Sequence, residues 1–354
     1  IKMPLGDEET CEMHDLMHDL AQMVGDECLL VDSPSEYVNE NTRHVGTVNN
    51  SQAVLRSASL SNTPWHLRSY VQFRGRGRLP KSDFDGNISS LRRLRVLFLK
   101  DKRYESLPES VGELIHLRYL KVCVHAHYLP EGITKLRYLQ ILDLQGSSNL
   151  RELPREFYRL TSLKHLRLGD DTLLIDMPPR FGELTSLQSL DTFVVGKNNG
   201  LDALSGMNLA ETLAIYFKKQ RESAVLEAAK ANLKGKKLTV LSLKFEYDSV
   251  TEADELLEHL QPPSTLTHLE VDGWNGERFP QWGIHQLPNL VSVRIRNCKR
   301  CRNILPFSRL PHIKSLVVKD CGELDLWDVK DEDGDAGKGN SVNSSTWPCM
   351  KSLE

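Results

Sequence analysis

The sequence has few cysteines, little net charge and no long apolar run, and each of these absences excludes a class of protein. It holds 7 cysteines in 354 residues. They are odd in number and scattered, which argues against a disulfide framework and for a reducing compartment. Its 45 basic and 48 acidic residues give a net charge of −3, so no overall field attracts nucleic acid or anionic lipid. No apolar run approaches the roughly 18 residues that a membrane-spanning helix needs.

The sequence also lacks the short motifs that commonly carry catalysis. It contains no Gly-x-x-x-x-Gly-Lys-Ser/Thr loop for nucleotide phosphates, no His-Glu-x-x-His helix for zinc and no Gly-x-Ser-x-Gly turn for a nucleophilic serine. Its carboxylates are scattered, and no nucleophile is paired with a base. We therefore expect a protein that is not an enzyme and that by itself holds no metal and no cofactor.

The sequence is rich in a leucine pattern that recurs along most of its length. The first clear unit is Leu94-x-x-Leu97-x-Leu99, and its spacing returns nine more times before an eleventh unit begins at Met350-x-x-Leu353. Successive central residues lie 22 to 28 positions apart, which fits the roughly 20–29 residues of a leucine-rich repeat. The ten central residues are Leu97, Leu120, Leu142, Leu166, Leu190, Leu213, Leu241, Leu269, Val293 and Leu316.

Each unit predicts one short strand followed by a turn. The two residues around the x of Leu-x-Leu point inward, because side chains alternate along a strand. One unit cannot bury its apolar face alone, so neighbours must stack. Leu-Pro pairs such as Leu129-Pro130 suit the start of a short helical turn, and the longest units leave room for helices at residues 223–233 and 251–260. The predicted fold is an α/β leucine-rich-repeat solenoid, with a curved parallel sheet on the concave face and short helices or 3-10 turns on the convex side.

Three regions follow one another in the predicted organisation. Residues 1–40 do not fit the repeat and indicate a small helical remnant of another domain, in keeping with a first residue, Ile1, that is not methionine. Residues 41–90 fit irregular capping repeats, and residues 91–354 hold the regular repeats, truncated at the C-terminus. Within them, residues 328–346 are acidic and then Gly/Ser/Asn-rich, so we expect a disordered insertion there.

Three short patterns point to metal or nucleic acid, and a structural role explains each of them better. Cys298-x-x-Cys301 is half of a zinc or redox site, but no second pair lies at metal-site spacing. Cys298 also fits a bend position where a small polar group bonds buried backbone. Residues 74–80 are basic, yet the neutral balance elsewhere favours a solvated loop. Residues 331–335 resemble a calcium loop that lacks both key ligands. We expect no metal site and no nucleic-acid partner.

The side chains beside each core leucine are expected to point toward the concave face. They mix charged and aromatic residues, which suits a protein partner. Many of them should be merely solvated, with less than about a third contributing to the binding energy. The candidate partner-binding residues are Phe98, Lys100, Tyr119, Lys121, Asp143, Arg167, Asp191, Tyr216, Lys244, Glu270, Asp272, Arg294, Arg296 and Lys319.

A resemblance to a known family adds a specific expectation. Residues 11–21, Cys-Glu-Met-His-Asp-Leu-Met-His-Asp-Leu-Ala, resemble the Met-His-Asp motif that ends the nucleotide-binding region of plant intracellular immune receptors. Arg43-His44-Val45 resembles the junction into their repeats, and residues 227–233 and the Leu-Pro units also match. The chain thus resembles, over essentially its whole length, the C-terminal part of a disease resistance protein of the coiled-coil class, which combines an NB-ARC nucleotide-binding domain with leucine-rich repeats.

The resemblance implies roles for the motif. Met13-His14-Asp15 would form it, with His14 approaching the phosphates of bound ADP and Asp15 bracing the turn. Residues 17–19 are a second, similar copy, which leaves the assignment to the first copy open. Residues 1–40 would then be the winged-helix (ARC2) end of the nucleotide-binding domain. Because the phosphate loop and most of that domain are missing, ADP or ATP with Mg is expected only in the full-length receptor.

The resemblance also implies a function for the repeats. In such receptors they recognise a pathogen effector or a guarded host protein and restrain the ADP/ATP switch, in the cytoplasm or also at the nucleus or the plasma-membrane periphery. We hypothesise that the basic residues of the first repeats face an acidic patch of the missing domain. The alternative is a generic leucine-rich-repeat scaffold or signalling adaptor without a nucleotide switch, and a metal- or nucleic-acid-binding protein is a third reading. The basic residues are Arg92, Arg93, Arg95, Lys100, Lys102 and Arg103.

Overall fold

The fold is described from a computed structural model of the chain. The predictions for Met13, His14 and Asp15, and those for residues 74–80 and 328–346, lie outside the described residues, as do Lys102 and Arg103. The structure describes residues 28–31, 42–47, 66–72, 91–100, 106–123, 125–218, 222–246, 253–280, 282, 286–302, 310–321 and 352–353.

The strands form two parallel sheets in which each strand pairs with its neighbour in the chain. The first sheet holds β1 (Cys28–Val31), β2 (His44–Thr47), β3 (Ser69–Gln72), β4 (Val96–Lys100), β5 (Tyr119–Cys123), β6 (Ile141–Asp143), β7 (His165–Arg167) and β8 (Ser189–Leu190). The second holds β9 (Thr192–Val195), β10 (Ala210–Phe217), β11 (Lys237–Phe245), β12 (His268–Asp272), β13 (Ser292–Arg296), β14 (Ser315–Lys319) and β15 (Ser352–Leu353).

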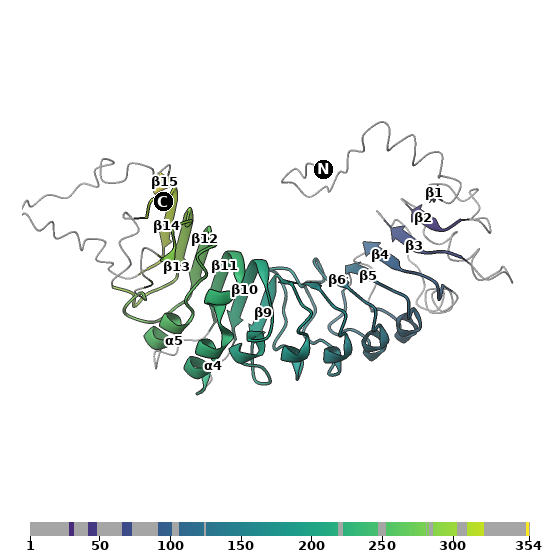
Figure 1. Cartoon of the computed structure of the whole chain (residues 1–354), viewed down its shortest axis with the longest axis horizontal. Helices are drawn as coiled ribbons and strands as arrows, with labels where there is room; N and C mark the ends of the chain where they lie inside the picture. Colours follow the sequence, from purple (N-terminus) through teal and green to yellow (C-terminus); the bar gives the residue numbers. More distant parts are fainter. Residues whose placement is uncertain are drawn as a thin grey trace, which may run out of the picture.

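Short helices follow the strands on the opposite side of the chain's arc. Figure 1 shows the strands along the inner curve and the helical turns along the outer one, which is the predicted solenoid. The two helices α4 and α5 lie where the longest repeats were expected to hold them. The helical segments are η2 (Glu109–Glu113), η3 (Glu131–Lys135), η4 (Phe157–Arg159), η5 (Phe181–Glu183), η6 (Leu201–Leu204), α4 (Ala224–Ala231), η7 (Leu233–Gly235) and α5 (Ala253–His259).

The core is a continuous apolar spine between the sheets and the outer turns. Leu97 and Leu99 are 1% and 0% exposed, as the alternation along the strand predicts. Larger side chains fill the middle of the spine, where the rings of Phe157 and Phe181 lie 6.3 Å apart. The Phe181 ring in turn lies 5.9 Å from that of Phe193. Phe193 belongs to β9, so the core continues across the break between the two sheets.

The outer turns stack closely because glycine and a capping carboxylate allow it. A Cβ atom on Gly112 would lie only 2.5 Å from the backbone oxygen of Gly132 in the next repeat, so a larger residue would force the turns apart. The Glu109 carboxylate accepts hydrogen bonds from the backbone N–H groups of Gly132 at 2.7 Å and Glu131 at 3.2 Å. It thereby satisfies donors at the start of η3 that have no partner inside the helix.

Small polar side chains tie the bends after the strands to buried backbone. Ser147, Cys298 and Cys321 occupy equivalent positions, and each donates to a backbone carbonyl of the preceding repeat, at 3.2, 4.0 and 3.8 Å. The sequence predicted this role for Cys298. Buried carbonyl groups need such donors wherever the strand ladder ends.

Candidate protein-binding surface

The open face of the sheets carries the predicted candidates, but they differ in how far they are exposed. Phe98 and Lys121 are partly exposed between buried neighbours, and Arg167 and Arg294 are exposed. Asp143 is only 1% exposed and Tyr216 only 6%, because adjacent side chains cover them. The backbone of Lys100 is described, whereas its side chain is not.

Several candidates bind one another. The Lys121 ammonium lies 3.3 Å from the Asp143 carboxylate and 5.2 Å from the centre of the Phe98 ring. Asp143 also accepts a hydrogen bond from the backbone N–H of Gln145 at 3.1 Å. On the later strands, Arg296 lies 3.5 Å from Glu270. A partner protein could bind these paired charges only after their present ion pairs are broken.

Asp191 lies at the break between the two sheets and holds the backbone together there. β8 ends at residue 190 and β9 begins at residue 192. The carboxylate between them accepts hydrogen bonds from the backbone N–H groups of Leu168 at 2.7 Å and Gly169 at 3.0 Å, and from the Gln145 side chain at 3.2 Å. Burial raises the pKa of Asp191, and these hydrogen bonds offset part of the rise. Asp191 therefore stabilises the backbone at this break, in addition to its predicted place on the concave face.

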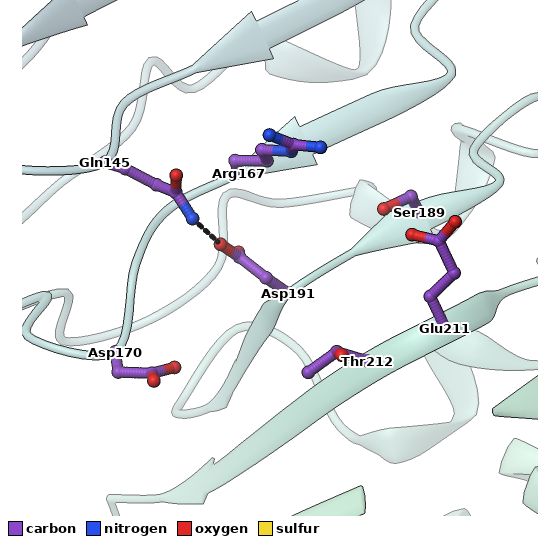
Figure 2. A pocket seen from close by; sticks show the side chains of 7 residues that line it. All are labelled: Gln145, Arg167, Asp170, Ser189, Asp191, Glu211 and Thr212. Carbon is purple, nitrogen blue, oxygen red and sulfur yellow. Dashed lines mark hydrogen bonds between the residues drawn. The ribbon is translucent and has the colours of Figure 1, made fainter. Parts of the chain in front are cut away.

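A polar hollow of about 270 Å³ opens beside this break. Figure 2 shows Arg167 and Glu211 on different strands around it, with the Gln145 amide bonded to Asp191. The Arg167 guanidinium forms no hydrogen bond or ion pair with any residue that the structure describes. The bulge at Glu211, whose φ is 69°, shapes one wall. The lining residues are Gln145, Arg167, Asp170, Ser189, Asp191, Glu211 and Thr212.

Only Arg167 and Asp191 of this lining were predicted from the sequence. The other five were not among the candidates: Gln145, Ser189 and Thr212 lie two residues, and Asp170 and Glu211 three residues, from the x of their Leu-x-Leu units. The sequence does carry a signal for the hollow, since the unit at Leu190 has Thr192 where the pattern expects leucine. Thr192 is fully buried and donates to the carbonyl of Gly169 at 3.2 Å.

Tyr216 forms the next cluster along the face. Its hydroxyl donates to the backbone carbonyl of Asp170 at 2.7 Å and accepts a hydrogen bond from the Lys244 ammonium at 2.9 Å. The Lys244 and Lys218 ammonium groups lie 4.7 and 5.5 Å from the centre of its ring, within the range of cation–π attraction. Lys218 is also paired with Glu246. Burial raises the pKa of Tyr216, so the hydroxyl stays protonated and keeps its donor.

The last described strands present a charged surface. Arg294 is exposed and has no hydrogen-bond or ion-pair partner among the described residues. Asp272 accepts a hydrogen bond from the Asn297 side chain at 2.7 Å, and Ser242 donates to Glu270 at 3.1 Å. Lys319, at the end of β14, is exposed. Among the described residues of this end, Arg294 is thus a cation without a partner beside residues such as Asp272 and Glu270 that accept hydrogen bonds.

Two of the basic residues assigned to the first repeats are engaged locally. Arg92 lies 3.3 Å from Glu113, and both side chains are largely exposed. Arg93 is hydrogen-bonded to the ring of His66. Arg95 has neither kind of contact with a described residue. Of these three described arginines, only Arg95 thus has a side chain that no described residue engages.

The cysteines of the C-terminal repeats are thiols with different environments. Cys298 and Cys301 are both 0% exposed, and Cys298 donates to the Arg296 carbonyl at 3.1 Å. The hydrogen bond with Cys321 raises the pKa of Cys298, and it lowers the pKa of Cys321 to about 7. Within the described part of the chain, no three or more His, Cys, Asp or Glu side chains are grouped as a metal would require. The same part contains no helix with the length and apolar character to cross a bilayer.

Comparisons with known proteins identify the family. A family described as "Leucine-rich repeat region" matches residues 66–353. The chain belongs to the leucine-rich-repeat family. The putative disease resistance protein RGA1 of Solanum bulbocastanum is 34% identical over 348 residues, which are 97% of this chain and 32% of that protein. Disease resistance protein RGA2 of the same species is 35% identical over 272 residues, or 74% of this chain and 28% of that protein.

The solved structures agree on the fold of this leucine-rich-repeat chain. The functional domain of InlJ from Listeria monocytogenes aligns with a TM-score of 0.52 at 11% identity, covering 86% of this chain and 60% of that one. At that identity the likeness shows the fold alone. The predicted leucine-rich-repeat solenoid and the predicted resemblance to plant disease resistance proteins are both confirmed. The chain spans less than a third of the length of the two curated relatives, at 32% and 28%.

Proposed function

We propose that this leucine-rich-repeat region is the recognition and regulatory module of a plant disease resistance receptor. Its concave face binds a pathogen effector, or a host protein that a pathogen alters, and its repeats restrain a nucleotide-binding domain that switches between ADP and ATP. One observation carries the proposal: the inner face of the arc presents Arg167 and Arg294, cations that no described residue pairs, in a chain whose relatives are named disease resistance proteins.

The regulatory half of the proposal follows from the resemblance. Residues 1–40 would end the nucleotide-binding domain, and Met13-His14-Asp15 would contact the phosphates of ADP held there with Mg. Residues 41–90 would cap the repeats that fill residues 91–354, in a receptor that works in the cytoplasm. The curated names support the resistance role, whereas the nucleotide and its domain come from the resemblance.

Restraint is tested in the full-length receptor that contains this chain. A receptor lacking residues 66–353 should trigger cell death in leaf tissue without any pathogen, and co-expression of this chain as a separate polypeptide should suppress that response. The purified intact receptor should retain ADP, measured by chromatography after heat release, while the shortened one exchanges it for ATP. A shortened receptor that stays silent and keeps its ADP would contradict the restraining role.

Recognition is tested by charge reversal on the concave face. Arg167→Glu and Arg294→Glu should each reduce pathogen-triggered ion leakage at least tenfold, because a free guanidinium in a contact is replaced by a repelling charge. Arg155→Glu is the matched control, since Arg155 is exposed on the outer turns. An unchanged response in both concave variants, at equal receptor abundance, would remove this face from recognition.

A further inference from the structure

We propose that the concave surface over β3 to β6 docks an acidic segment of a partner protein that carries bulky apolar side chains. The inference rests on the proposed function, because it takes protein recognition by the concave face as given and assigns one part of that face a partner chemistry. Two groups of residues, here together called the apolar–arginine face, carry it. They are the apolar residues Val71, Val96, Phe98, Tyr119 and Ile141, and the basic residues Arg68, Arg95 and Arg118.

The apolar residues form one contiguous patch because the strand register aligns them. Val71 pairs with Phe98 across β3 and β4, and Val96 pairs with Tyr119, which pairs with Ile141. All five alternate with buried core residues and are partly exposed on the open side of the sheet. Contiguous apolar patches that are rimmed by polar residues mark interaction sites on protein surfaces.

The arginines form a row at the edge where the same strands begin. The backbone N–H of Arg95 bonds the carbonyl of Arg68 at 2.7 Å, and that of Arg118 bonds the carbonyl of Arg95 at 2.8 Å. The three residues are therefore direct neighbours on successive strands, roughly 4.8 Å apart. No described residue forms a hydrogen bond or ion pair with their guanidinium groups. Like charges on adjacent strands destabilise a sheet, so an anionic partner would relieve a cost that the free chain bears.

The combination is confined to these strands and is not a consequence of the repeat pattern. At the position of the arginines, the following strands carry Gln140, Lys164 and Gln188, which are aligned by the same backbone bonds. At the position of the apolar residues, they carry His165 and Ser189. Both changes occur around β6 and β7. Packing of the repeats requires only the core leucines. The outward residues that differ from repeat to repeat therefore reflect the partner that the surface binds.

An acidic protein segment fits this face better than nucleic acid or lipid. Guanidinium groups bind carboxylates in a bidentate manner, and the apolar patch needs bulky side chains to cover it. A nucleic acid or anionic membrane would be favoured by a broad positive field, whereas the net charge of the chain is −3. Of the other cations on the concave face, Lys121 is paired with Asp143 and Arg296 with Glu270, while Arg167 and Arg294 lie on β7 and β13, outside the apolar patch.

The test is a selection of random twelve-residue peptides, displayed on phage, against the purified full chain. Enriched peptides should combine aspartate or glutamate with leucine or aromatic residues. For a selected peptide, fluorescence anisotropy should show an affinity at least tenfold weaker with the double variant Arg95→Glu/Arg118→Glu and with Phe98→Ala. The affinity should also fall as salt rises. The matched controls are Arg155→Glu for charge and Ile175→Ser for an exposed apolar side chain, which is 48% exposed away from this face; each should bind as the unmodified chain does.

The outcomes separate this inference from the proposed function. Peptides that lose affinity with Arg167→Glu or Arg294→Glu but bind the double variant normally would keep concave-face recognition and overturn the assignment to this face. Enriched peptides that are basic or neutral would overturn it as well. Phe98→Ala keeps all arginines, so a loss there at unchanged melting temperature supports the apolar half independently. Tight binding of single-stranded DNA or phosphatidylserine vesicles in place of the acidic peptides would also overturn the proposal.

Discussion

At the scale of single residues, the buried Lys236 and the partly exposed Cys321 make the chain sensitive to pH. Lys236 is 6% exposed, and its ammonium donates to the carbonyls of Leu204 at 2.7 Å and Met207 at 2.9 Å. Burial lowers its pKa to about 8 from 10.5. The unfolded chain therefore holds this proton more tightly than the folded chain does, and the buried charge costs stability at neutral pH.

The variant Lys236→Met tests how this buried charge makes the stability depend on pH. Between about pH 8 and 10.5 the folded protein releases the proton before the unfolded chain does, so the stability contributed by this residue rises with pH. The free energy of unfolding of the unmodified chain relative to Lys236→Met should therefore increase from pH 7 to pH 10, measured by urea unfolding. Lys237→Met, at the exposed neighbour, should show no such trend. A difference in the free energy of unfolding that stays constant across this pH range would mean that burial does not lower the pKa of Lys236.

Cys321 should be the most reactive of the described thiols. Its pKa is lowered to about 7 by the hydrogen bond with Cys298, and its side chain is partly exposed. Because the thiolate is the nucleophile, the rate of iodoacetamide alkylation at Cys321 should rise with a midpoint near pH 7, followed by mass spectrometry. Cys298→Ala removes the hydrogen bond and should move that midpoint upward, toward the ordinary 9.0. An unmoved midpoint would show that the pair is not coupled.

At the scale of secondary-structure elements, the junction of β7, β8 and β9 is where the regular ladder fails. The carboxylate of Asp191 replaces the missing strand bonds to Leu168 and Gly169. Asp191→Ala leaves two backbone donors without this acceptor, so the free energy of unfolding should fall by about 1–3 kcal/mol. Asp171→Ala, at an exposed carboxylate nearby, is the control for charge. Urea unfolding that finds the two variants equal would contradict the bridging role.

The same junction shows what sequence reasoning could reach among the elements. The leucine spacing predicted the strands because inward rows of leucine must stack for any of them to be buried. Alternation then placed Phe98 and Lys121 on the concave side of their strands. It could not predict that Lys121 forms an ion pair with Asp143, because that contact depends on the register between repeats. The ammonium of Lys121 is therefore already engaged. The hollow beside Asp191 was missed because it lies at the break between the two sheets, where the regular ladder of strands ends.

At the scale of the whole molecule, the arc contains two sheets but one core. The ladder of hydrogen-bonded strands is interrupted after β8, while the rings of Phe157, Phe181 and Phe193 continue the apolar spine across the interruption. In a stacked array each unit is stabilised mainly by its neighbours. The coupling between the two sheets should therefore be carried by this core more than by backbone bonds.

Phe181→Ala tests that coupling. Phe181 is fully buried, and removing a buried phenyl ring costs about 3–5 kcal/mol. Because its ring contacts both sides of the break, hydrogen exchange should accelerate in β7 of the first sheet and in β10 of the second. Tyr158→Ala, which removes a contact with Arg180, should leave both strands as protected as before. Acceleration confined to β7 would mean that the sheets open independently, and that a partner bound near β4 could not influence the repeats beyond β9 through the core.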